Sequence, residues 1–313
     1  MLTARLLSVR CCCLDRWFLH GRCRLPAQFL LLMAMFALPG ALAAQVKQTN
    51  EIIDFRLRDK YLIVVQTTVN AAGPFSFLLD TGATHTVIDP GLARQLQLPI
   101  IGEASLTTVS DVRKDRLVRL REVRIGNSGV SELGAVIDKL DDVKLKAPGI
   151  RGVLGEDFLS NFDFLIDYKA RILRFGEESP AGERCRFETM GHYRGLPTTN
   201  RLLIEAEFMD VSGNKVQLQL DTGARMPELF PVRQNSFPSQ PWAGSMAFDS
   251  GPNGTRIHSH ITITVGSTKV HDLDVVQSRR GVAFDAVGLL PASIFHRIYI
   301  SHSGGFVVLN PGE

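Results

Sequence analysis

The sequence has 313 residues, of which 45% are hydrophobic, and it carries 35 basic and 32 acidic side chains. This length suffices for one large or two smaller hydrophobic cores, and the composition excludes a collagen-like, coiled-coil or wholly disordered chain. Five basic residues but only one acidic residue lie in the first 43 positions, which leaves 30 basic against 31 acidic residues in the remainder. A nearly neutral remainder indicates neither nucleic acid nor an anionic membrane as a partner.

The first 43 residues have the three parts of an export signal in the expected order. Scattered arginines precede the apolar run Phe29–Leu38, and Pro39-Gly40 then leads into the small-residue pattern Ala41-Leu42-Ala43. The run is too short to span a bilayer, which needs about 20 apolar residues. We expect residues 1–43 to be a signal peptide and the product to be periplasmic or secreted, or membrane-anchored if the leader stays uncleaved. No other stable membrane association is expected.

The chain after the leader contains two similar halves. Residues 61–84 (YLIVVQTTVNAAGPFSFLLDTGAT) and 201–225 (RLLIEAEFMDVSGNKVQLQLDTGAR) both show two alternating strands around a short turn, followed by Asp-Thr-Gly-Ala. Residues 152–159 (GVLGEDFL) and 288–295 (GLLPASIF) match in the same way, and each leads into a further hairpin pattern. The interval between the two motifs is 72 residues in the first half and 67 in the second. Matching order and spacing predict an internal repeat.

The repeat divides the remaining chain into two β-rich units. We expect the first unit over residues 44–176, a polar linker over 177–190 and the second unit over 191–313. Each unit is expected to be built of strands, with one short helix directly after Gly152 or Gly288.

In each half, a strongly apolar strand ends at an aspartate, Asp80 in the first half and Asp221 in the second. A lone carboxylate there is costly to desolvate, so it needs hydrogen-bond donors or a partner. The following threonine supplies a hydroxyl, and the glycine after it lets the backbone turn tightly and present amides. If the halves pack about a pseudo-twofold axis, the two carboxyls meet and share a proton. One can then deprotonate a water while the other donates to a substrate carbonyl oxygen.

The two halves resemble retropepsin-like aspartic peptidases, and the pair resembles the exported bacterial aspartyl peptidases in which two such units are fused. The resemblance rests on Asp80-Thr81-Gly82-Ala83-Thr84 with residues 152–159, and on weaker counterparts in the second half. It covers nearly all of residues 50–310. It implies an all-β fold of two retropepsin-like β-barrel units related by a pseudo-twofold axis, each with one short helix.

The resemblance also implies the roles of individual residues and the reaction. Asp80 and Asp221 would be catalytic, and Thr81 and Thr222 would hydrogen-bond across the axis. The remaining supporting residues would be four glycines: Gly82, Gly223, Gly152 and Gly288. The implied activity is endopeptidase hydrolysis of a peptide or protein by an activated water, with no cofactor and no metal.

The second half departs from the family pattern in two places. Arg225 stands where the first half has Thr84, and the segment from Gly288 to Pro291 lacks the Gly-x-Asp of the first half. These departures leave open an alternative, a catalytically impaired peptide-binding protein that retains the fold. Because one chain holds both halves, we expect a monomer, and assembly of the site by homodimerisation is disfavoured.

Two further features have weaker implications. The family places a flap over the cleft after each motif, which points to Gly102–Asp111 and Gly244–Gly254. His258 and His260 precede an alternating strand, and alternation alone would place both imidazoles on one face. The nearby sequence shows no matching cluster of Cys, His or acidic residues, so the pair does not predict a metal site.

Overall fold

The structure is a computed structural model. It describes residues 46–47, 50–107, 112–176, 178–189, 191–193, 196–198, 201–209, 215–230, 247–249, 256–278 and 288–312. These residues belong to one compact unit, which spans Ala44–Glu313. The predicted leader, 1–43, lies outside the described residues, as does most of the second predicted flap. No helix in the described ranges is both long enough and apolar enough to cross a membrane.

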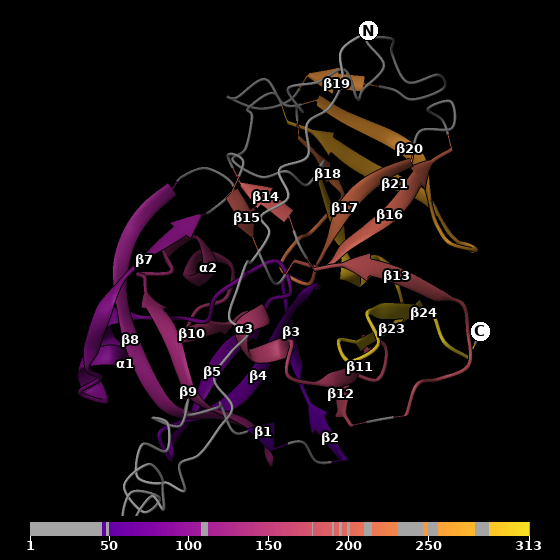
Figure 1. Cartoon of the computed structure of the whole chain (residues 1–313). Helices are drawn as coiled ribbons and strands as arrows, with labels where there is room; N and C mark the ends of the chain where they lie inside the picture. The colour runs from indigo at the N-terminus through magenta and orange to yellow at the C-terminus, as the bar shows by residue number, and fades with distance from the viewer. Residues whose placement is uncertain are drawn as a thin grey trace, which may run out of the picture. The chain divides into compact units, whose positions relative to one another are not determined.

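Strands of the first half close into a ring, drawn from indigo to magenta in Figure 1. Around the ring, β4 pairs with β5, β5 with β10, β10 with β6, β6 with β9, β9 with β8, and β8 again with β4. The strands are β4 (Leu62–Val69), β5 (Ala72–Leu79), β6 (Val87–Ile88), β8 (Val112–Ile125), β9 (Ser128–Ile137) and β10 (Gly152–Leu154). Three more strands extend this sheet: β1 (Val46–Lys47), β3 (Arg56–Arg58) and β7 (Ile100–Thr107).

Strands of the second half close into a ring of the same kind. The pairs are β16–β17, β17–β22, β22–β18, β18–β21, β21–β20 and β20–β16, and the order of parallel and antiparallel pairings matches that of the first ring. The strands are β16 (Leu203–Phe208), β17 (Lys215–Asp221), β18 (Glu228–Leu229), β20 (Arg256–Val265), β21 (Thr268–Gln277) and β22 (Gly288–Pro291). Outside the ring, β19 (Ala247–Asp249) pairs with β20, and β14 (Gly191–Tyr193) forms a hairpin with β15 (Leu196–Thr198).

An antiparallel sheet with strands from both halves joins the rings. Its order is β2, β12, β11, β23, β24 and β13, with the bounds β2 (Glu51–Asp54), β11 (Asp163–Asp167), β12 (Ile172–Phe175), β13 (Arg184–Glu188), β23 (Arg297–Ser301) and β24 (Phe306–Leu309). At its centre, β11 of the first half pairs with β23 of the second. Strand β13 lies in the segment 177–190, for which the sequence suggested a polar linker. It forms because Phe187 is buried while its neighbours are exposed, a strand-like alternation.

Helices are few and short. They are α1 (Pro90–Gln95), α2 (Asp141–Lys146), α3 (Glu156–Leu159) and the 3-10 turn η1 (Ala292–Ile294). The expected short helix after each glycine is present as α3 and η1, whereas α1 and α2 are additional. The Asp89 carboxylate accepts hydrogen bonds from the backbone amides of Gly91 and Leu92, which explains why α1 begins at Pro90. The prediction of an all-β fold with two barrel units is confirmed.

The apolar strand that leads to Asp80 is buried on both faces. Phe77 and Leu79 point into a core that continues through both rings and the joining sheet. Leu78, between them, packs in a second cluster with Leu140 and Ile150, which flank α2. Because both faces are covered, this part of the strand is a continuous apolar run instead of an alternating one.

Candidate active site

Asp80 and Asp221 stand at equivalent places in the two rings. Strand β5 runs parallel to β10, and the backbone amide of Asp80 donates to the carbonyl of Leu154 at the end of β10 (3.0 Å). In the second ring, β17 runs parallel to β22, and Asp221 is in register with Pro291. Each aspartate therefore leaves the core at the carboxyl end of a buried strand.

The turn after each aspartate supplies backbone donors to its carboxylate. The amide of Gly82 donates to Asp80 Oδ1 (2.8 Å), and the amide of Gly223 donates to Asp221 Oδ1 (2.6 Å). A second amide, of Ala224, also donates to Asp221 Oδ1 (3.1 Å). These donors provide the compensation that a carboxylate at the end of a buried strand requires.

The two glycines also bring the carboxyls together. A Cβ atom built on Gly82 would lie 2.5 Å from Cγ of Asp221, and one built on Gly223 would lie 3.0 Å from Cγ of Asp80. Each glycine therefore lies against the carboxyl of the opposite half, where a side chain has no room. This reciprocal approach sets the two carboxyls side by side.

Thr81 and Thr222 connect the two halves through four hydrogen bonds. The hydroxyl of Thr81 donates to the carbonyl of Leu220 (2.9 Å) and accepts from the amide of Thr222 (3.1 Å). The hydroxyl of Thr222 donates to the carbonyl of Leu79 (2.7 Å) and accepts from the amide of Thr81 (3.0 Å). Both side chains are buried, so the two loops hold each other in one arrangement.

The two carboxyls are unequal. Burial raises the pKa of Asp80, while the Gly82 amide and a hydrogen bond from Asp221 hold that increase back. The pKa of Asp221 is raised well above its ordinary value by burial, by the negative charge of Asp80 and by the hydrogen bond that Asp221 makes to it. Asp221 is only 8% exposed, whereas Asp80 is partly exposed. Both pKa values are thus raised, and that of Asp221 is raised the more.

Gly152 and Gly288 pack beside the strands that carry the aspartates. Gly152 is in register with Phe77 on β5, and a Cβ atom there would overlap the Phe77 ring and the Val87 carbonyl. Gly288 is in register with Leu218 on β17, and a Cβ atom there would overlap the carbonyl of Glu228. Both glycines thus allow close packing of neighbouring strands under the site.

One buried polar contact at the site was missed by the sequence reasoning. Nε2 of Gln219 donates to the carbonyl of Gly82 (2.9 Å), and the Arg201 guanidinium donates to Oε1 of Gln219 (3.1 Å). The first half has Leu78 at the position of Gln219. The available signal was a polar residue between Leu218 and Leu220 in an otherwise apolar strand.

The other sequence-predicted features are only partly described. Arg225 is exposed in the loop after Asp221. Within Gly102–Asp111, residues up to Thr107 belong to β7, which pairs with β8, and 108–111 lie outside the described residues. Only β19 of Gly244–Gly254 is described. The flap assignments therefore stay predictions.

The expectation that His258 and His260 share one strand face is wrong. The pairing of β20 with β21 shifts register between His258 and Ile261, and His260 has a positive φ of 63°. This bulge buries His258, next to Gln277, and turns His260 outward to Asp272. Within the described ranges, no group of three or more His, Cys, Asp or Glu side chains could hold a metal ion.

Residues 65–161, which include Asp80, Gly152 and α3, match the family model described as gag-polyprotein putative aspartyl protease. This segment of the chain resembles a retropepsin-like aspartic peptidase unit. The family resemblance that the motifs suggested is thus confirmed, and the matched segment contains the first of the two aspartate loops. A comparison with curated proteins found no significant match.

A solved aspartic proteinase supports the peptidase fold. The aspartic proteinase from Irpex lacteus aligns over 83% of this chain and 97% of its own, at 12% identity and a TM-score of 0.54. A retropepsin-like aspartic protease from Rickettsia conorii aligns over 42% of this chain and 93% of its own, at 20% identity and a TM-score of 0.31. At these identities the likeness concerns the fold alone, and the first alignment extends it across both halves.

Proposed function

We propose that the chain is an exported aspartic endopeptidase that hydrolyses peptide bonds with a water activated by Asp80 and Asp221. The observation that carries this proposal is the reciprocal approach of Gly82 to the Asp221 carboxyl and of Gly223 to the Asp80 carboxyl. This approach supports a pair made of one carboxyl from each half, with backbone donors on both sides. Family and fold support the peptidase class.

The inequality of the pair supports a division of roles. The Asp80 carboxylate takes a proton from a water held between the two side chains, while protonated Asp221 donates its proton to the carbonyl oxygen of the scissile peptide. The water oxygen bonds to the carbonyl carbon and gives a neutral diol. Asp80 then gives its proton to the leaving nitrogen, the C–N bond breaks, and Asp221 recovers a proton from a diol hydroxyl. Both aspartates return to their starting states.

The threonine contacts support this chemistry by holding the geometry before substrate binds. Neither loop can move without breaking hydrogen bonds to the other half, so the carboxyls need little reorganisation during the reaction. The alternative of an impaired peptide-binding protein has less support, because both carboxyls keep their donors and lie together. A peptide or protein substrate, a monomeric state and export all belong to the proposal.

The test expresses the full chain with its leader and compares wild type with Asp80→Asn and Asp221→Asn. Each substitution removes the proton transfer of one partner at nearly constant shape, so we expect the rate of peptide cleavage to fall by about 10²–10⁴-fold or more. Cleavage of a diverse peptide library is followed across pH, and circular dichroism checks the fold. Retained activity in either variant would remove the pair from the mechanism.

The same preparation tests export and oligomeric state. The amino-terminal sequence of the purified protein should begin at Ala44, and the product should be periplasmic or secreted. Light scattering should give the mass of one chain. Intact residues 1–43 in a membrane fraction would indicate an anchored protein instead, and a dimer would contradict the monomer proposal.

A further inference from the structure

The joining sheet contains two hairpins, β11–β12 and β23–β24, and the residues after β11 and β23 correspond to each other in the two halves. Tyr168 follows β11 directly, and His302 follows β23 directly. Asp163 pairs with Ser301 and Asp167 with Arg297, so β11 and β23 pair antiparallel over their full length. His302 of the second half thereby reaches α3 of the first half.

His302 makes a buried contact with Glu156, the first residue of α3. Its Nε2 lies 2.8 Å from Oε2 of Glu156, and its Nδ1 lies 2.8 Å from the carbonyl oxygen of Phe162. Because a carbonyl only accepts, Nδ1 carries a hydrogen. The exposed fractions of the Glu156 and His302 side chains are 1% and 6%. The aromatic rings of Phe164 and Phe187 lie beside the imidazole. The contact between the halves is therefore buried.

Glu156 is also tied to the loop that carries Asp80. Its backbone amide donates to the carbonyl of Ala83 (2.8 Å), and the amide of Ala83 donates to the carbonyl of Asp80 (3.3 Å). A Cβ atom on Gly155 would lie 2.8 Å from that same Ala83 oxygen, so α3 packs directly against the loop. A short path of direct contacts therefore runs from His302 through Glu156 to the backbone of Asp80.

The charged groups around the pair are few and identifiable. Burial raises the pKa of Glu156, the hydrogen bond and charge of His302 lower it, and the charges of Asp157 and Asp80 raise it further. Burial lowers the pKa of His302, but its contacts with Glu156 and the Asp163 charge outweigh this, so the pKa is raised overall. Nδ1 of His85 lies 4.0 Å from Oδ2 of Asp157, the second residue of α3. The contact with Glu156 thus favours the charged imidazolium of His302.

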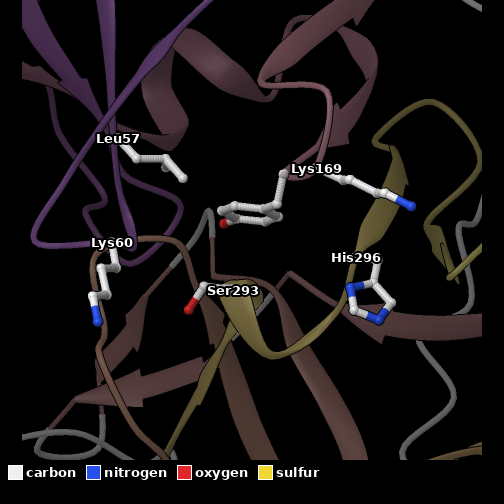
Figure 2. A pocket seen from close by; sticks show the side chains of 6 residues that line it. Leu57, Lys60, Lys169, Ser293 and His296 are labelled. Atoms are coloured by element: carbon white, nitrogen blue, oxygen red, sulfur yellow. The ribbon is translucent and has the colours of Figure 1, made fainter.

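The second half lacks the counterpart of this contact. Ala292 begins η1 at the place where Glu156 begins α3, so its methyl group offers nothing to Tyr168. The Tyr168 hydroxyl is buried and has no hydrogen-bond partner among the described residues. A cavity of about 450 Å³ lies here instead, lined by Leu57, Lys60, Tyr168, Lys169, Ser293 and His296. Figure 2 shows Ser293 and His296 in its wall, opposite Leu57.

We propose that Glu156 and His302 are positioning residues that hold the Asp80 loop against the second half. The inference rests on the proposed function. The buried contact of Glu156 with His302 holds the loop that carries Asp80. At the corresponding place in the second half, the Tyr168 hydroxyl has no hydrogen-bond partner among the described residues and an open cavity lies beside it. The pair touches neither the substrate nor the reacting atoms, and it acts through Ala83.

The first test is a double-mutant cycle in the full chain with Glu156→Ala, His302→Ala and both together. A loosened Asp80 loop should lower kcat by about 10–100-fold with KM within about twofold, because misplacement of a reacting group by about 1 Å has effects of this size. The double variant should be no worse than either single variant, since the contact is lost in each. Unchanged kcat per folded molecule, or additive losses, would overturn the proposal.

Two matched controls separate positioning from general stability. Asp167→Asn breaks an ion pair with Arg297 in the same sheet, and Tyr168→Phe changes the residue that corresponds to His302. Both should leave kcat unchanged. A comparable loss of kcat in these variants would show that the effect of Glu156 and His302 is a general destabilisation.

The pH dependence of kcat distinguishes a positioning role from a purely structural one. The contact is ionic while Glu156 is ionised and His302 is protonated, and this form is lost as pH rises through the raised pKa of His302. Wild-type kcat should therefore fall on the alkaline side. In Glu156→Gln, a neutral amide–imidazole contact replaces the ion pair, so the part of the fall that follows His302 should disappear, while the part caused by deprotonation of Asp221 should remain. An identical alkaline limb in wild type and Glu156→Gln contradicts the proposal, even if the alanine variants fail to fold.

A spectroscopic measurement distinguishes failure of this inference from failure of the proposed function. The carboxyl carbon of Asp80 is titrated by NMR in wild type and in His302→Ala, with Asp80→Asn for assignment. Loosening should lower the pKa of Asp80 toward its ordinary value, because burial raises it. If wild type cleaves no peptide, the peptidase proposal fails, and the pair is still judged from this titration. An unchanged titration rejects the positioning role.

Discussion

At the scale of single residues, the site depends on the absence of side chains at two positions. Gly82 and Gly223 combine a tight turn with close approach to the opposite carboxyl. The sequence signals the turn, because glycine after a buried strand and a threonine is typical of one. It does not signal which group lies opposite, because that neighbour comes from about 140 residues away in the chain.

Gly82→Ala should abolish activity while leaving the fold of each ring intact. The new methyl group would lie 2.5 Å from Cγ of Asp221, so the pair must separate. Gly134→Ala is the matched control, since a Cβ atom there would lie 3.5 Å from Leu117, an ordinary contact. Peptide cleavage and thermal unfolding are measured for both. Full activity in Gly82→Ala would contradict the close approach of the two halves.

At the scale of elements, the joining sheet and the two aspartate loops both connect the halves. The joining sheet pairs β11 with β23 along their length, and the threonines add four buried hydrogen bonds at the aspartate loops. The strands themselves follow from alternation and apolar runs in the sequence. Their pairing across the halves does not, because a strand pattern specifies a buried face but not the partner. Strand β13, within the expected linker, is an example of this limit.

Thr81→Val should destabilise the protein by roughly 2–6 kcal/mol at constant side-chain shape. It leaves two buried groups without their partner, the carbonyl of Leu220 and the amide of Thr222, and each costs about 1–3 kcal/mol. Thr81→Ser keeps the hydroxyl and should lose far less. Chemical denaturation gives the free energy of unfolding of each. Equal stabilities for the valine and serine variants would show that the crossed hydrogen bonds contribute little.

At the scale of the whole molecule, the aspartate pair should couple stability to pH. The pKa of Asp221 is raised in the folded state, so its contribution is fully present below about pH 4, the ordinary range of an aspartate, and is lost as pH rises through the folded pKa. Wild type should therefore lose stability toward neutral pH. The cause is the burial of a second negative charge beside Asp80.

Asp221→Asn removes that penalty, because the amide is a neutral replacement for the protonated carboxyl. The variant should be more stable than wild type at neutral pH, and the difference should vanish in acid. Unfolding free energies across pH 3–8 measure this. A constant difference between the two proteins would mean that Asp221 does not titrate in this range.

The sequence by itself determined the elements and the chemistry that the pattern requires: two similar orders of strands, an aspartate at the end of a buried strand in each, and donors directly after it. These features are local, so spacing and periodicity reveal them. Only the tertiary structure decided what meets across the halves, because such contacts join residues far apart in the chain. The inequality of Asp80 and Asp221, the contact of Glu156 with His302, and the bulge that separates His258 from His260 all arise from packing that no local pattern specifies.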